Sequence, residues 1–210
     1  MEDRGHQHRG QKHINVSGPL AGRLFAERIH ADGATLSMAG NRMAVAEAEF
    51  VFEMAHDLVP RTAPYSQTEV MAAVAELHLG IEVPNSRFLN FVGAGEAQLI
   101  ADNACGHEFV LGPRVDIAWR DIELAAHAVH ATVEGTSRRY ERDGIGANVL
   151  GDPRIALTWL ANELSSLGVT LGAGQLVTTG TCVVPLEIAV GDTVTADFGV
   201  LGVVSARFTA

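Results

Sequence analysis

The amino-acid sequence predicts a β-rich α+β fold with about two main helices. The stretch "VAEAEFVFEM", residues 45–54, alternates like a half-buried strand, and residues 174–208 form short β-branched runs separated by glycines. Helix start signals are clear in two segments, 66–80 and 151–168. The chain has 210 residues, 47% of them hydrophobic, which is enough to bury one sizeable core. We therefore expect one globular domain.

The first residues differ in composition from the rest, because they are polar, basic and rich in histidine. His6, His8 and His13 could form a metal-binding tract, but a flexible leader is the preferred interpretation. We place this leader at residues 1–13 and a single domain at residues 14–210. No signal-peptide core and no apolar run of about 18 residues is present, so a soluble cytoplasmic protein is expected.

Two turns should precede the alternating strand. The stretch "LAGRLFAERI", residues 20–29, fits either a short helix or a strand. The following "HADGATLSMAGNR" contains the turn signals Asp-Gly and Ala-Gly-Asn, which lead into residues 45–54.

The alternating strand places three carboxylates on one face. Glu47, Glu49 and Glu53 are separated by even numbers, and successive side chains of a strand point to opposite faces. The side chains of the other face are apolar and should form the core: Ala46, Ala48, Phe50 and Phe52. Crowded like charges destabilise a strand unless positive charge lies among them. Solvent with nearby Lys or Arg could supply that charge, and so could a metal ion.

The segment "SQTEVMAAVAELHLG" is typical of a helix. Ser66 can cap its start, and Glu69 completes a capping box. Val70, Val74 and Leu77 then recur at helical spacing.

Extended structure should follow this helix. "IEVPNSRF" is expected to be a strand broken by Pro84. "AQLIADNACGHEFVLGP" suggests two extended pieces joined by a polar turn, and "HAVHATVEG" alternates up to a hairpin-like turn at Glu134 and Gly135. The clearest helix comes next, with Asp152 at its start, Pro153 in its first position and Gly168 at its end.

Charge and cysteine content exclude several classes of protein. Lys and Arg number 15 and Asp and Glu 25, which gives a net charge of −10 and argues against nucleic acid or an anionic membrane as the main partner. An anionic substrate would then need local positive charge, which a bound cation could supply. Cys105 and Cys182 show no CxxC spacing, so neither a disulfide framework nor a thiolate zinc site is indicated.

Another acidic residue, Glu82, also lies on a strand that looks buried. It is flanked by Ile81 and Val83, and a charged glutamate in such surroundings is uncommon without a partner. Together with Glu47 and Glu49 it would form an oxygen-only site, which suits Mg²⁺ or Mn²⁺ rather than zinc. Solvated charges on an edge strand are the alternative.

Several separated motifs resemble one family. "VAEAEFVF", "HLGIEVPNSRF", "LIADNACGHEFVLGP", "GDPRIALTWLANEL" and "LVTTGTCVVPLEIAVGDTVTADFGVLG" occur in this order and are similar to the 2-keto-4-pentenoate hydratase branch of the fumarylacetoacetate hydrolase superfamily. The match covers roughly residues 18–208. It implies a mixed β-sandwich roll of the fumarylacetoacetate hydrolase C-terminal type with a few flanking helices. It also implies that Glu47, Glu49 and Glu82 are the metal ligands.

The resemblance implies metal-dependent hydration of a 2-hydroxy-2,4-dienoate, through its 2-oxo-3-enoate form, to a 4-hydroxy-2-oxo acid in aromatic-compound catabolism. Three alternatives stay open: a 2-oxo-3-enedioate decarboxylase, an acylpyruvate C–C hydrolase, and a non-catalytic partner subunit. A homo-oligomer is expected, and a complex with a related decarboxylase or hydratase is also compatible with the resemblance.

Further site residues follow from the same resemblance. Thr179, Gly180 and Thr181 match a loop near the substrate and are candidates for binding its carboxylate, the alternative being a simple Thr-rich strand end. Asp102 and Cys105 are the catalytic candidates, although Asp102 could only shape its turn. Some relatives carry serine in place of Cys105, and a thiol is a poorer hydrogen-bonding group.

Four residues beside these motifs are weaker candidates for a role in the site. His78 and His107 could shuttle protons, but ordinary packed or exposed histidines are the preferred interpretation. Trp159 is expected in the core, and Glu53 at a solvated strand end.

The resemblance also implies an upstream Gly-x-Lys motif whose lysine reaches the active site. "RGQKHI" does not match that motif, and Lys12 lies too close to the matching region to be the same lysine. We therefore expect metal binding with reduced hydration for the chain as given.

Overall fold

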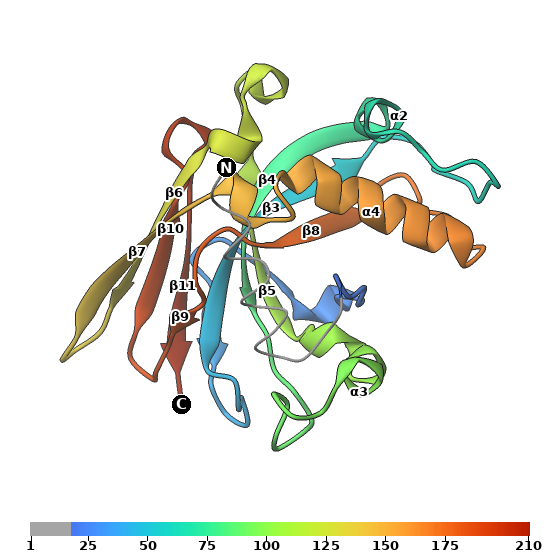
Figure 1. Ribbon diagram of the computed structural model, residues 1–210. Coiled ribbons are helices and arrows are strands. Elements are labelled where there is room, and N and C mark those ends of the chain that lie inside the picture. Colours follow the sequence, from blue (N-terminus) through green and yellow to red (C-terminus); the bar gives the residue numbers. More distant parts are fainter. Residues whose placement is uncertain (1–17) are drawn as a thin grey trace, which may run out of the picture.

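The computed structural model describes residues 18–210, and β-strands dominate it (Figure 1). Its strands are β1 (Ile29–Ala31), β2 (Thr35–Ser37), β3 (Val45–Met54), β4 (Val74–Val83), β5 (Glu108–Arg114), β6 (Ala128–Glu134), β7 (Arg139–Ile145), β8 (Leu176–Thr181), β9 (Leu186–Glu187), β10 (Thr193–Asp197) and β11 (Val203–Thr209). The α-helices of the described residues are α2 (Gln67–Ala72), α3 (Glu96–Ala101) and α4 (Pro153–Ser166). The expectations for the leader, its histidines and Lys12 lie outside the described residues.

The strands form two mixed sheets. Sheet A has six strands, in the order β1-β5-β4-β3-β8 with β9 added to β3, and sheet B has five, in the order β2-β11-β10-β6-β7. Each sheet contains one parallel pair, β1 with β5 and β2 with β11, among antiparallel pairs. Figure 1 shows sheet B on the left, beside the long curved strands β3 and β4. The predicted mixed β-rich α+β fold is confirmed.

Strand β3 supplies the centre of the core. All four side chains predicted for its apolar face are buried: Ala46, Ala48, Phe50 and Phe52. The Phe50 ring packs edge-on against Phe198, with ring centroids 5.1 Å apart, and the Phe52 ring lies 6.1 Å from that of Trp119. Because this face is fully used for packing, the carboxylates of β3 project from the opposite side of sheet A.

Helix α4 begins and ends where the sequence predicts. The Asp152 side chain accepts a hydrogen bond of 2.7 Å from the Arg154 N–H, and Pro153 occupies the first helical position. Gly168, two residues after the last helical residue Ser166, has φ +73°, a left-handed conformation that favours glycine. The helix packs against α2 and β8.

The predicted helix over residues 66–80 is only partly correct. Its start is confirmed, because Ser66 and Glu69 form the full capping box. The helix ends at Ala72, however, and strand β4 begins two residues later. Leu77 and Leu79 are both buried and lie two residues apart, the period of a strand rather than of a helix. Pairing with β3 therefore overrides the helical spacing of the earlier residues.

The first extended piece predicted in residues 97–113 is also wrong. "EAQLIA" forms helix α3, which consists mostly of good helix formers and buries Leu99 completely. The polar turn and the second strand, β5, are confirmed. The ambiguous stretch before β1 forms a short 3₁₀ turn, Ala26–Arg28, followed by that strand.

The hairpin after "HAVHATVEG" is confirmed as β6 and β7, closed by a 2.8 Å hydrogen bond from the Gly135 N–H to the Arg138 carbonyl. The short strands predicted near the end of the chain are β8 to β11. Among the described residues, no helix has the length and apolar character needed to cross a membrane.

Candidate metal centre

Strands β3 and β4 bring three glutamates together on one face of sheet A. Glu47 lies directly opposite Glu82 in the antiparallel pair, and Glu49 lies opposite Gly80. One carboxylate oxygen from each glutamate lies within 4.8 Å of the other two. The arrangement offers three oxygen ligands from two neighbouring strands to a single cation.

Burial and mutual repulsion make these carboxylates hard to ionise together, although only Glu49 is fully buried and Glu47 and Glu82 are half-buried. Burial and the charge of Glu82 raise the pKa of Glu47 to about 8. Burial and the charge of Glu47 raise the pKa of Glu49 to about 7, and burial with the charge of Glu49 raises the pKa of Glu82 well above its usual range. The cluster therefore retains protons near neutral pH, which a divalent cation would displace on binding.

Glu49 carries the strongest sign that a cation fits. Its side chain is fully buried, and its Oε2 accepts a 2.9 Å hydrogen bond from the Gly180 N–H. Its Oε1 is also buried and accepts no hydrogen bond of normal geometry from residues 18–210, although the Glu82 carboxyl and the Thr178 side chain interact with the Glu49 carboxylate. A buried carboxylate oxygen without a partner is unfavourable, so a cation is the natural partner for Oε1.

Gly80 shapes the space beside the glutamates. A Cβ at this position would lie 2.2 Å from Cζ of Phe109 and 3.1 Å from Cγ2 of Val51. The absent side chain thus makes room for the Phe109 ring, and Phe109 itself pairs with Glu82 across β4 and β5. Sequence reasoning missed both residues, although a single glycine inside a strand often marks a close approach.

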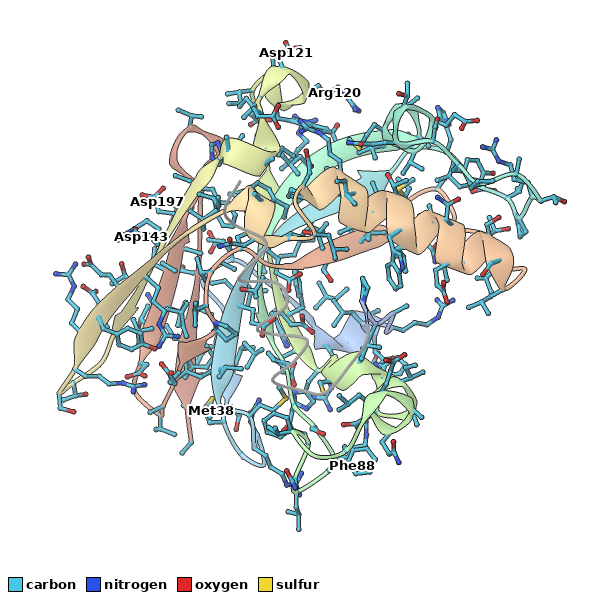
Figure 2. All side chains as sticks on the ribbon, viewed as in Figure 1. Met38, Phe88, Arg120, Asp121, Asp143 and Asp197 are labelled. Carbon is cyan, nitrogen blue, oxygen red and sulfur yellow. The ribbon has the colours of Figure 1, made fainter. Side chains whose placement is uncertain are left out.

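Within residues 18–210, no other group of three or more His, Cys, Asp or Glu side chains converges in this way. Figure 2 shows Asp143 and Asp197 near each other on sheet B, where His130 lies between them in register. His130 Nδ1 lies 2.6 Å from the Asp143 carboxylate, whose side chain is 88% exposed. This group is solvated and internally paired, in contrast to the three glutamates of sheet A.

Asp102 is held as a buried carboxylate. Burial would raise its pKa, but hydrogen bonds from Ser86 and Arg87 outweigh burial and leave the pKa below its usual range. The Ser86 hydroxyl donates at 2.5 Å, and the Arg87 guanidinium and backbone N–H donate at 2.6 and 3.0 Å. Sequence reasoning missed Ser86 and Arg87, which follow β4 within "NSRF". The bonding pattern indicates a fixed anion at the base of the turn.

Cys105 retains its proton at neutral pH. Burial, together with the charge of Asp102, raises the pKa of the thiol to about 11, and the charges of Glu82 and Glu47 act in the same direction. Cys105 thus lies close enough to the glutamate cluster for the negative charge of that cluster to raise the pKa of the thiol. Its backbone is tied to the end of β4, because the Asn85 N–H donates to the Cys105 carbonyl at 2.9 Å.

The turn that carries Cys105 has an unusual backbone. Asn103, Ala104 and Cys105 have φ values of +58°, +53° and +63°, which non-glycine residues rarely adopt in succession. The Asn103 side chain accepts from the Arg23 N–H at 2.7 Å and donates to the Arg23 carbonyl at 2.6 Å. A Cβ at Gly22 would lie 2.4 Å from the Asn103 carbonyl oxygen. Asn103 therefore joins the strained turn to the segment that leads into β1.

The "TTGTC" segment lies beside the same cluster. Thr181 pairs with Glu49 across β3 and β8. The Thr179 hydroxyl donates to the Phe50 carbonyl at 3.0 Å, and the Thr181 hydroxyl donates to the Val183 carbonyl at 2.8 Å. Both hydroxyl protons are thus engaged by main-chain oxygens, so direct binding of a substrate carboxylate by these threonines stays a prediction.

The weaker candidates lie near acidic side chains, but His78 Nε2 and His107 Nδ1 make no hydrogen bond within the described residues. His78 Nδ1 lies 3.2 Å from the Gly112 carbonyl, and its Nε2 lies 3.4 Å from Glu53, near the far end of β3. His107 Nδ1 lies 3.8 Å from Glu108, and burial lowers the pKa of this histidine. Trp159 is only half-buried and is not among the buried residues of α4, so its expected place in the core needs correction.

Comparison with known proteins connects this geometry to characterised relatives. No family model matches the sequence. The chain is 33% identical over 201 residues to a 2-keto-4-pentenoate hydratase of Burkholderia vietnamiensis strain G4, an alignment covering 95% of this chain and 73% of the relative. It is 30% identical over 202 residues to a 2-hydroxyhexa-2,4-dienoate hydratase of Comamonas testosteroni, covering 95% and 74%.

A solved structure shares both the fold and moderate sequence identity. It is the 4-oxalocrotonate decarboxylase of Pseudomonas putida G7, with 26% identity, a TM-score of 0.79, and coverage of 94% of this chain and 72% of that one. That protein has been solved in complex with calcium and acetate, and also with magnesium and adipate, with 73% of its chain covered in the second case. Metal binding by a structural relative agrees with the acidic cluster found in this chain.

Proposed function

This chain belongs to the 2-keto-4-pentenoate hydratase family of the fumarylacetoacetate hydrolase superfamily, and we propose that it hydrates a 2-hydroxy-2,4-dienoate to a 4-hydroxy-2-oxo acid in aromatic-compound catabolism. The observation that carries the proposal is the meeting of Glu47, Glu49 and Glu82 within 4.8 Å. The buried Oε1 of Glu49, which accepts no hydrogen bond of normal geometry from residues 18–210, supports a cation at that point.

Glu47, Glu49 and Glu82 would hold the cation, and their oxygen-only donor set suits Mg²⁺ or Mn²⁺. Such an ion would supply Lewis-acid polarisation of the substrate's 2-oxo group and would offset its carboxylate charge. The reaction adds one water molecule across the conjugated C=C bond, with the hydroxyl on C4 and the proton on C3, and needs no oxidant or reductant.

Residues around the glutamates would orient the substrate and move protons. Asp102 is kept ionised by Ser86 and Arg87, so it stays a catalytic candidate as a fixed anion that can accept a hydrogen bond, while its lowered pKa makes it a weak acceptor of protons. Cys105 is a neutral thiol and can act there only as a weak donor. The buried Phe109 ring would limit the access of bulk water. Of the predicted substrate-binding residues Thr179, Gly180 and Thr181, Thr181 stays the candidate for the substrate-carboxylate side, because the Thr179 hydroxyl is bonded to the Phe50 carbonyl and the Gly180 N–H to Glu49.

A decarboxylase of 2-oxo-3-enedioates is the second candidate function. The specific observation in its favour is the likeness to 4-oxalocrotonate decarboxylase, seen in structure and in a 34% identical stretch of 140 residues of the Pseudomonas putida enzyme. That stretch covers 67% of this chain and 51% of the decarboxylase, whereas the hydratase alignments extend over nearly all of this chain. Hydration is therefore the first choice.

The deciding experiment gives the purified chain, with Mg²⁺ or Mn²⁺, a 2-hydroxy-2,4-dienoate and, separately, a 2-oxo-3-enedioate. We expect metal-dependent formation of a 4-hydroxy-2-oxo acid from the first. Release of CO₂ from the second without hydration of the first would assign the chain as a decarboxylase. Activity with neither, despite metal binding, would favour a non-catalytic subunit. Glu49→Gln is the control that separates activity of this site from a contaminant.

A further inference from the structure

Strand β8 leaves regular pairing with β3 directly beside the metal centre. The register shifts by one residue between Glu49 and Val51, so that Thr179 and Gly180 together lie opposite Phe50. An extra residue of this kind is a β-bulge, which turns backbone groups of the bulged strand away from the ladder.

Two hydrogen bonds show what the bulge does with its polar groups. The Gly180 N–H points to Oε2 of Glu49 at 2.9 Å instead of to a main-chain carbonyl. The Phe50 carbonyl oxygen lies opposite the bulge, and it accepts a 3.0 Å hydrogen bond from the Thr179 hydroxyl. Gly180 has φ +96°, a conformation that favours glycine and aims its N–H at the carboxylate.

We propose that the Thr179–Gly180 bulge positions Glu49, because it anchors Oε2 and leaves Oε1 as the oxygen presented to the cation. The inference rests on the proposed function, since it concerns the same divalent ion. Its independent support is that Oε2 accepts a hydrogen bond from the Gly180 N–H, whereas the buried Oε1 accepts no hydrogen bond of normal geometry from the described residues. Gly180 and Thr179 are thus positioning residues that act through Glu49. Outer-shell hydrogen bonds of this kind typically change metal affinity about 10–100-fold.

The main test is a matched pair of glycine substitutions. An alanine Cβ at Gly180 would meet no atom within 4 Å, so Gly180→Ala changes the preferred backbone conformation without a clash. Gly151, just before α4, has φ +86° and equally open surroundings, so Gly151→Ala controls for the general cost of such a change. With Mn²⁺ titrated at one pH, we expect about 10–100-fold weaker binding for Gly180→Ala and at most about threefold weaker binding for Gly151→Ala.

Thr179 gives a second test that does not depend on the folding of the glycine variant. Thr179→Val removes the donor to the Phe50 carbonyl, and Thr179→Ser keeps it. We expect the valine variant to weaken Mn²⁺ binding and the serine variant to restore it. Oxalate affinity at saturating Mn²⁺ should stay within about threefold of wild type, because the bulge acts on the cation's ligand.

The outcomes separate this inference from the proposed function. Equal Mn²⁺ affinities for Gly180→Ala and Gly151→Ala would overturn the positioning role and leave the metal centre intact. Normal Mn²⁺ affinity with weakened oxalate binding in Thr179→Val would also overturn it, since the residues would then serve the substrate. A wild-type chain that binds no Mn²⁺ would overturn both proposals.

Discussion

Glu47 and Glu82 face each other directly across the β3–β4 pair. Side chains at such positions lie roughly 5 Å apart at Cβ, and like charges there destabilise a sheet. The conflict is increased by Glu49, which is buried beside them. Either protons or a cation must relieve it, so the cation-free sheet should be sensitive to pH and the loaded sheet much less so.

The first prediction concerns the pH dependence of the metal-free protein. The folded-state pKa is about 8 for Glu47 and about 7 for Glu49, both above the usual value of 4.5. Between about pH 4.5 and 8, these two side chains bind more protons in the native state than in the unfolded state. The stability that they contribute is therefore fully present below about pH 4.5 and is lost as the pH rises towards 8. Thermal unfolding in EDTA from pH 5 to 9 should show a decreasing Tm. A flat profile in wild type, or the same slope in a Glu47→Gln/Glu49→Gln variant, would contradict it.

The second prediction tests the ligand set. Glu82→Ala should weaken Mg²⁺ and Mn²⁺ binding by more than the roughly 10–100-fold typical of an outer-shell change. Its metal-free Tm should be no lower than that of wild type, because one of three clustered charges has been removed. Glu53→Ala is the matched control, since Glu53 lies on the same face of β3 but its side chain is 37% exposed and contacts His78. Calorimetric titration should show unchanged binding in this control.

The third prediction is that 2-oxo acids bind only with the cation. Oxalate and pyruvate should raise the Tm when Mg²⁺ is present, by ordinary ligand linkage, and leave it unchanged in EDTA. Succinate, whose carboxylates are too far apart to form the same small chelate ring, serves as the control. Equal stabilisation by oxalate in EDTA would show that the anion binds without chelation.

The fourth prediction concerns the space at Gly80. Gly80→Ala places a methyl group against the Phe109 ring and should lower the free energy of unfolding by about 1–3 kcal/mol. Phe109→Leu in the same chain should recover part of that loss, because the smaller side chain frees the space. Urea unfolding of wild type, both single variants and the double variant gives the coupling. If the effects of the two substitutions on the free energy of unfolding simply add, the side chains at positions 80 and 109 do not compete for the same space.

The fifth prediction concerns the buried anion. Asp102→Asn leaves the Ser86 and Arg87 donors poorly satisfied and should cost about 1–3 kcal/mol at pH 7. Because the folded pKa of Asp102 is lowered, its contribution is present above the unfolded pKa and is lost as pH falls through the folded pKa. Urea unfolding should therefore show the two proteins converging in acid. Asp116→Asn, at a side chain 77% exposed, should have little effect. Unchanged stability with lost activity would instead make Asp102 purely catalytic.

Local chemistry explains which parts of the fold could be predicted. The capping box of Ser66 and Glu69 and the start of α4 at Asp152 depend on nearby residues only, and both are found in the structure. The end of α2 depends on the pairing of β4 with β3, which no local pattern reveals. Helix α3 was missed for a related reason, since six residues with one buried anchor, Leu99, give almost no periodic signal.

Part of the candidate site could likewise be predicted from the sequence, and part could not. The even spacing of the glutamates on β3 predicts a shared face, and their meeting with Glu82 follows once the two strands pair. The sequence pattern gave no such signal for backbone groups or for the space that a missing side chain provides. The Gly180 N–H is invisible in a list of side chains, and the use of Gly80 becomes clear only when Phe109 is seen beside it.

The pairing of β2 with β11 has a consequence for how the chain is made. Residues 35–37 lie beside residues 207–209, so sheet B cannot be completed until almost the whole described chain has left the ribosome. Contacts between such distant segments slow folding, since a long loop must close before they form. During synthesis β2 therefore lacks its β11 partner, and its unpaired edge is open to misassembly until residues 203–209 have been made.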